Sequence, residues 1–163
     1  MPACDFAPAH IRAIAPYQPG KPIAELAREF GLAEHAIVKL ASNENPLGPS
    51  PAGLLAAQES LGGMALYPDG AGFALKAALS ARLDVAADHI VLGNGSNDVL
   101  DMVARAFLDS GSSSVFSAHA FAVYPIATQS AGAEGIAAKA RDLGHDLAAM
   151  RAAIRPDTRV VWI

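Results

Sequence analysis

Residues 91–107, VLGNGSNDVLDMVARAF, combine a short apolar run, a turn with two glycines and an amphipathic helical pattern. Many α/β proteins hold a phosphate with a strand, a glycine-rich turn and a helix in this order, because N–H groups at a helix amino end attract anions. The glycines permit close approach, and Ser96 adds a hydroxyl donor, whereas Asp98 would repel a phosphate placed too near it. The stretch therefore predicts either a phosphate site or a plain strand-to-helix turn with Asn94 and Gly95 left-handed.

The motif GNGSND does not match the two best-known nucleotide signatures. It lacks the third glycine of G-x-G-x-x-G, and no Gly-Lys-Ser/Thr follows as in a P-loop. A dinucleotide or nucleoside triphosphate is therefore not favoured as the ligand.

Strand and helix patterns alternate on both sides of this turn. We expect strands at 36–42, 89–93, 113–117, 135–140 and 159–163, and helices at 22–30, 52–61, 73–83, 96–108, 121–132 (interrupted by Pro125) and 146–154. Residues 1–20 carry four prolines and predict an extended arm with at most one short helix, which needs a surface to lie on, such as a second subunit. Alternation of this kind predicts an α/β fold with a predominantly parallel sheet.

The composition predicts a cytoplasmic globular chain. Of 163 residues, 52% are hydrophobic and 17% charged, so a core can form, and a net charge of −4 argues against nucleic acid as a partner. No apolar stretch reaches the roughly 18 residues of a membrane span, and no signal peptide is apparent. Cys4 has no second cysteine to pair with, and the five histidines lack metal-ligand spacing, so we expect no metal site.

Five separated stretches together resemble a known family. They are APYQPGKPIAELAREFG, VKLASNENPLGPSP, LYPDGAGFALKAALSARLDV, IVLGNGSNDVLDMVARAF and SAHAFAVYPIATQSAGAE, in this order. From about residue 11 onward the chain resembles the N-terminal part of histidinol-phosphate aminotransferases, which are class I/II pyridoxal-phosphate (PLP) enzymes. The resemblance implies fold type I, the aspartate-aminotransferase-like fold, with part of the large domain present.

The resemblance also implies roles for individual residues. Gly95, Ser96 and Asn97 match the backbone cup for the PLP phosphate, and Phe121 matches the aromatic ring that stacks on the cofactor. Tyr67 matches a tyrosine that reaches the PLP phosphate of a neighbouring subunit, which implies a homodimer with shared active sites. The residues matching the substrate side are Tyr17, Asn43, Glu44 and Asn45.

Each of these residues also has an ordinary structural interpretation. Phe121 suits core packing at the start of a helix, and Tyr67 before a proline suits a turn. Asn43 and Asn45 suit turn caps, and Tyr17 suits an anchor in a proline-rich arm.

The chemistry of the family needs residues that this sequence does not show. Transamination requires a Schiff-base lysine, an aspartate on the pyridine nitrogen and an arginine for the substrate carboxylate. None of Lys21, Lys39, Lys76 and Lys139 lies in the family's Ser-x-x-Lys context, so we identify no catalytic residue. The chain is therefore expected to be an N-terminal fragment, inactive and poorly folded alone. Its expected parts are an arm and short helix (1–35), a small-domain connection with the substrate-side loop (36–66) and a truncated PLP-binding domain (67–163).

For the complete protein the resemblance implies transamination between L-histidinol phosphate and 2-oxoglutarate in histidine biosynthesis. Within the same family, an aromatic amino acid aminotransferase and a threonine-phosphate decarboxylase remain alternatives. A non-catalytic α/β module that binds a small phosphate at Gly95 is the alternative outside it.

Overall fold

The computed structural model describes residues 3–163, which divide into two compact units. Within the described residues, unit 1 comprises residues 3–17 and Asp88–Ile163, and unit 2 comprises Gln18–Ala87. The α-helices are α1 (Ala9–Arg12), α2 (Ile23–Phe30), α3 (Pro51–Ser60), α4 (Phe73–Leu83), α5 (Ser96–Phe107), α6 (Val123–Ser130) and α7 (Leu147–Ala152). Short 3-10 helices span Ala3–Phe6, Glu34–Ala36, Leu61–Gly63 and Ala87–His89. None of the helices in the described residues is both long and apolar enough to cross a membrane.

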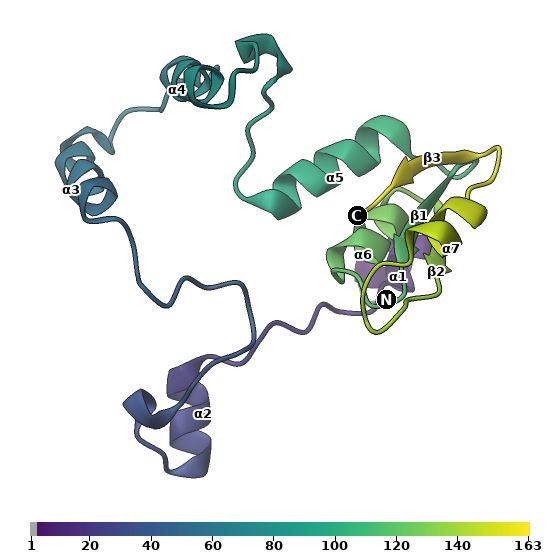
Figure 1. Cartoon of the computed structure of the whole chain (residues 1–163), viewed down its shortest axis with the longest axis horizontal. Helices are drawn as coiled ribbons and strands as arrows, with labels where there is room; N and C mark the ends of the chain where they lie inside the picture. Colours follow the sequence, from purple (N-terminus) through teal and green to yellow (C-terminus); the bar gives the residue numbers. More distant parts are fainter. Residues whose placement is uncertain (1–2) are drawn as a thin grey trace. The chain divides into compact units, whose positions relative to one another are not determined.

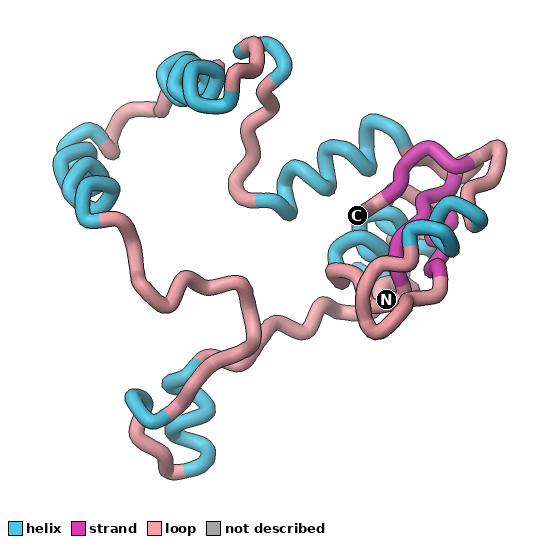
Figure 2. Tube along the Cα trace, in the orientation of Figure 1, coloured by secondary structure: helices cyan, strands magenta, loops and turns pink. Residues whose placement is uncertain are grey.

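Unit 1 contains a three-stranded parallel sheet in the order β2-β1-β3 (Figures 1 and 2). The strands are β1 (Ser113–Ser117), β2 (Glu134–Ala138) and β3 (Thr158–Val161). Ser113 lies opposite Glu134 on one side and Thr158 on the other, and the β1–β3 register shifts after Ser113. Three of the four strands predicted within residues 88–163 are thus confirmed, those at 113–117, 135–140 and 159–163, and so is their parallel arrangement.

Helices cover both faces of this sheet. On one face, Phe116 packs with residues of α5, α6 and β3 in a cluster that includes Ala104, Ala127 and Trp162. On the other face, Val115 packs with Met150 of α7 and with Ala138 of β2. Neighbouring residues of β1 therefore point to opposite layers, as alternation along a strand requires.

The amino ends of the outer strands are joined by ion pairs of Arg155. Its guanidinium donates to both carboxylate oxygens of Glu134 at 3.0 and 2.7 Å, and also to Asp157 at 3.0 Å. The hydrogen bond from Arg155 lowers the pKa of the Glu134 carboxyl. Arg155 therefore connects the segment before β3 to β2 across the central strand.

The proline-rich arm contains a short helix, α1, that packs on its own chain. The carbonyl of His10 in α1 accepts a hydrogen bond at 3.0 Å from the side-chain amide of Gln129 in α6. Gly132 has φ +78°, and a Cβ there would lie 3.7 Å from the His10 ring. The surface on which this part of the arm lies is thus α6 of the same chain.

Unit 2 consists of short helices joined by long loops. Helix α2 ends at Gly31, whose left-handed φ of +65° suits glycine, and α3 begins where the Ser50 hydroxyl accepts from Gly53 N–H ahead of Pro51. Both boundaries agree with the sequence prediction. Ala27 is the one buried residue within 18–87.

Two predicted strands do not form, and one predicted helix differs. Residues 37–42 and 90–93 adopt no regular structure, and Val38 and Val91 are exposed. A strand needs a neighbour for its ladder, and none of the strands in residues 3–163 pairs with either segment. Pro125 does not interrupt α6, because it lies in the first turn, where an N–H has no intrahelical acceptor.

Candidate functional site

The turn before α5 depends on two glycines for different reasons. Gly95 has φ +89°, a conformation that L side chains rarely adopt. A Cβ on Gly93 would lie 2.9 Å from a methyl of Val99 and 3.1 Å from the Cβ of Asp98, so Gly93 permits close packing against the helix. Asn94 is not among the residues with positive φ, which corrects the alternative in which Asn94 and Gly95 are both left-handed.

The amino end of α5 presents backbone donors. Gly95 is the N-cap residue and has no side chain to accept from the first turn, so the N–H groups of Ser96 and Asn97 lack a cap from it. Asp98 accepts a hydrogen bond from Asn94 N–H at 3.0 Å, which holds its carboxylate on the turn. The backbone N–H groups of Ser96 and Asn97 are therefore available to bind an anion, whereas the Asp98 carboxylate is already bonded to Asn94 N–H.

Helix α5 runs opposite to β3, so its amino end faces the edge of the sheet where the strands end (Figure 1). Phe121 lies at the same edge, in the short connection between β1 and α6. Helices α5 and α6 also pack in one apolar cluster, through Ala104 and Ala127. The structure thus brings the Gly95 turn and Phe121 to one edge of unit 1, where open α/β sheets bind ligands.

Three aromatic rings form a series at this edge. Phe121, which is 41% exposed, meets Tyr124 edge-to-face with ring centroids 5.9 Å apart. Tyr124 in turn stacks on Trp162 at 5.3 Å with an interplanar angle of 8°. Phe121 therefore has packing support on one side and remains accessible to a ligand.

Ser117, the last residue of β1, carries a buried hydroxyl without a hydrogen-bond partner in the described residues. By strand alternation it shares a face with Val115, on the side of α7.

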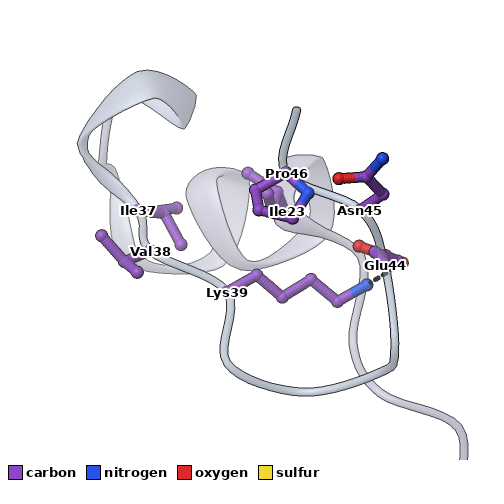
Figure 3. A pocket seen from close by; sticks show the side chains of 7 residues that line it. All are labelled: Ile23, Ile37, Val38, Lys39, Glu44, Asn45 and Pro46. Carbon is purple, nitrogen blue, oxygen red and sulfur yellow. Dashed lines mark hydrogen bonds and ion pairs between the residues drawn. The ribbon is translucent and has the colours of Figure 1, made fainter. Parts of the chain in front are cut away.

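Two of the proposed substrate-side residues of unit 2, Glu44 and Asn45, line a pocket within that unit, whereas Asn43 does not (Figure 3). The residues lining it are Ile23, Ile37, Val38, Lys39, Glu44, Asn45 and Pro46. Asn45 shapes its loop by accepting from Leu47 N–H at 3.0 Å and donating to the Gly48 carbonyl at 2.8 Å. In this structure the Asn45 side chain therefore caps its own turn, as one of the two interpretations predicted.

Glu44 forms an ion pair with Lys39, at 2.6 Å between Nζ and Oε1. The Lys39 side chain is only 15% exposed. Asn43 and Tyr67 are exposed, Tyr67 completely, and Tyr17 is 49% exposed at the end of the arm in unit 1. Among the described residues, no group of three or more His, Cys, Asp or Glu side chains is placed to hold a metal ion.

No protein-family model matches the chain. Individual relatives, however, match it over its whole length. It is 73% identical to histidinol-phosphate aminotransferase 1 of Thiobacillus denitrificans, covering 100% of this chain and 44% of the relative. The second histidinol-phosphate aminotransferase of Nitrosospira multiformis is 63% identical, again over 100% of this chain and 42% of the relative.

The chain belongs to the histidinol-phosphate aminotransferase family. It spans less than half the length of the curated relatives it matches.

Solved structures place the chain in fold type I. A histidinol-phosphate aminotransferase from Sinorhizobium meliloti, in complex with pyridoxal-5′-phosphate, superposes with a TM-score of 0.78 at 23% identity, over 93% of this chain and 40% of that one. An aspartate aminotransferase of Thermus thermophilus gives a TM-score of 0.75 at 18% identity, over 96% of this chain and 44% of that one. At these identities the likeness establishes the fold alone, and it confirms the predicted fold class.

Sequence reasoning did not identify the residues that support Phe121. Trp162 and Tyr124 form its aromatic series, and Thr128 contacts both. The positions 121, 124 and 128 follow helical spacing, which is a weak signal that was available in the sequence. The contribution of Trp162 comes from another element, so spacing could not reveal it.

Proposed function

We propose that the complete protein transfers the amino group of L-histidinol phosphate to 2-oxoglutarate, using PLP. The observation that carries this proposal is the 73% identity over the whole chain to a protein named histidinol-phosphate aminotransferase. The amino donor becomes a ketone, and 2-oxoglutarate becomes glutamate, so the amino group is conserved over the two half-reactions.

PLP, when bound, supplies an electron sink for the bond that breaks at the substrate Cα. This chain's part in the proposal is binding and orientation. The N–H groups of Ser96 and Asn97, with the Ser96 hydroxyl, would hold the phosphate, and Phe121 would pack on the ring. Two observations support the fit, namely the absence of a side-chain cap from Gly95 and the accessible face of Phe121.

The substrate side is proposed from residues of the arm and of unit 2. Tyr17 and the loop Asn43–Asn45 would face the amino donor, and Tyr67 would reach the phosphate bound by a second subunit. Complete exposure of Tyr67 is compatible with a contact outside its own chain. We therefore propose a homodimer with shared sites, and we retain the division at residues 35 and 66 as a proposal.

The test uses the full-length protein that carries this chain. We expect amino transfer from L-histidinol phosphate and little from phenylalanine, and no decarboxylation of threonine phosphate. Phe121→Ala should weaken PLP binding about two- to tenfold, because an aligned aromatic contact contributes roughly 0.5–1.5 kcal/mol. Phe107→Ala is the matched control, since Phe107 is exposed at the opposite end of α5.

Failure of the full-length protein to bind PLP would refute the proposal. If the protein instead turned over phenylalanine or threonine phosphate in preference to histidinol phosphate, the proposed cofactor would stand and the proposed substrate would be wrong.

A further inference from the structure

A single buried hydroxyl connects the elements that support Phe121. Thr128 in α6 is completely buried. Its oxygen donates to the Tyr124 carbonyl at 2.8 Å. It also lies 2.7 Å from the hydroxyl of Ser114 in β1 and 3.3 Å from the indole nitrogen of Trp162 after β3. Three elements of unit 1 thus meet at one oxygen atom.

Hydrogen-bond counting assigns the direction of each contact. A threonine hydroxyl has one hydrogen to donate and two lone pairs to accept with. The hydrogen goes to the Tyr124 carbonyl, so Thr128 accepts from Ser114 and from Trp162, whose indole nitrogen can only donate. Every donor and acceptor position of this hydroxyl is therefore used.

The bond from Trp162 restricts the plane of its indole ring. Tyr124 lies almost parallel to that ring, and Phe121 meets Tyr124 at 86°. An edge-to-face contact depends on the orientation of both rings. The orientation of Phe121 therefore depends on Trp162, and that of Trp162 depends on Thr128.

We propose that Thr128, acting through the stacked Trp162 and Tyr124 rings, is a positioning residue that sets the plane of Phe121 toward the cofactor. This inference rests on the proposed function, because it needs PLP beside Phe121. It adds a residue that touches neither cofactor nor substrate.

The test compares variants of the full-length protein in two measurements. Thr128→Val keeps the shape of the side chain and removes the hydroxyl, whereas Thr128→Ser keeps the hydroxyl. Thr158→Val is the matched control, because Thr158 forms a 3.0 Å hydroxyl pair with Ser113, the neighbour of Ser114 in β1, which points to the other face of the sheet. Near-ultraviolet circular dichroism of the PLP-free protein reports the aromatic series, and titration with PLP, followed by the circular dichroism of its visible band, reports the site.

In Thr128→Val we expect a reduced aromatic signal, a changed visible band and a two- to tenfold weaker PLP affinity, the range of one aromatic contact. Thr128→Ser should restore both signals, and Thr158→Val should leave both unchanged even where it lowers the melting temperature. This inference would be overturned if Thr128→Val kept the PLP affinity and the visible band of the wild type while Phe121→Ala bound PLP more weakly. That result would leave the proposed function standing. Equal losses in Thr128→Val and Thr158→Val would also overturn it, because they indicate general destabilisation. Failure of the wild-type protein to bind PLP would overturn both proposals.

Discussion

The two units of this chain bury their apolar residues very differently. In unit 1, Val115 is completely buried and Phe116 is 8% exposed, each in a cluster with helical residues. In unit 2, Phe73 is 77% exposed and Leu40 is 91% exposed. Both units contain α-helices, but of the three in unit 2 only α2 gathers its apolar residues on one side, as α5 of unit 1 does. Unit 1 builds its own core, whereas the apolar side chains of unit 2 remain accessible to another surface.

The largest expected effect is a difference in stability between two variants, each with one phenylalanine replaced by alanine but in different units. Phe116→Ala should lower the free energy of unfolding by about 3–5 kcal/mol, because it opens a cavity in the core. Phe73→Ala should change it by less than about 0.5 kcal/mol, as is usual for exposed positions. Urea unfolding of the 163-residue chain, followed by the fluorescence of Trp162 in the core of unit 1, measures both, because this core is the part of the chain expected to unfold cooperatively. Similar losses for the two variants would show that Phe73 is covered, and the contrast between the units would fail.

An intermediate effect is expected on the pH dependence of stability, through the Arg155–Glu134 ion pair at the amino ends of the strands. Because hydrogen bonding from Arg155 lowers the pKa of Glu134 in the folded state, the ion pair stabilises the fold above the carboxyl's ordinary pKa of about 4.3. That stability is lost as pH falls through the lower folded pKa. Unfolding measured between pH 7 and 3 should therefore depend less on pH in Glu134→Gln than in the wild type. An identical pH dependence in both proteins would exclude this contribution.

The last comparison concerns two serines of β1, and it includes the smallest expected effect, that of Ser117→Ala. Ser114→Ala removes a buried hydroxyl that bonds to Thr128 and should cost roughly 1–2 kcal/mol. Ser117→Ala removes an oxygen without a partner and should be within about 0.5 kcal/mol of neutral in the isolated chain. Thermal unfolding of the two variants distinguishes them. A large loss in Ser117→Ala would show that its hydroxyl has a partner.

The fold of unit 1 was largely predictable from sequence, because local signals and tertiary packing agree there. The strand 113–117 and the helix after Gly95 formed as expected from apolar periodicity and glycine placement. The segments 36–42 and 89–93 carry the same kind of apolar pattern but form no strand. A strand depends on a hydrogen-bonded neighbour, and local sequence does not encode whether one is present.

The candidate site was predictable in part for a similar reason. Gly95 and Phe121 belong to continuous motifs, so the resemblance could point to them directly. Thr128 and Trp162 meet through a contact between residues 34 positions apart, which no spacing rule predicts. Whether the residues assigned by resemblance bind the cofactor stays a prediction.

The most direct measurement is a crystal structure of the full-length protein with PLP bound. The account predicts phosphate oxygens within hydrogen-bond distance, about 2.7–3.2 Å, of the backbone nitrogens of Ser96 and Asn97, with the Phe121 ring against the pyridine ring. A phosphate bound away from the amino end of α5, or a Phe121 ring turned into the core with no contact to PLP, would contradict it.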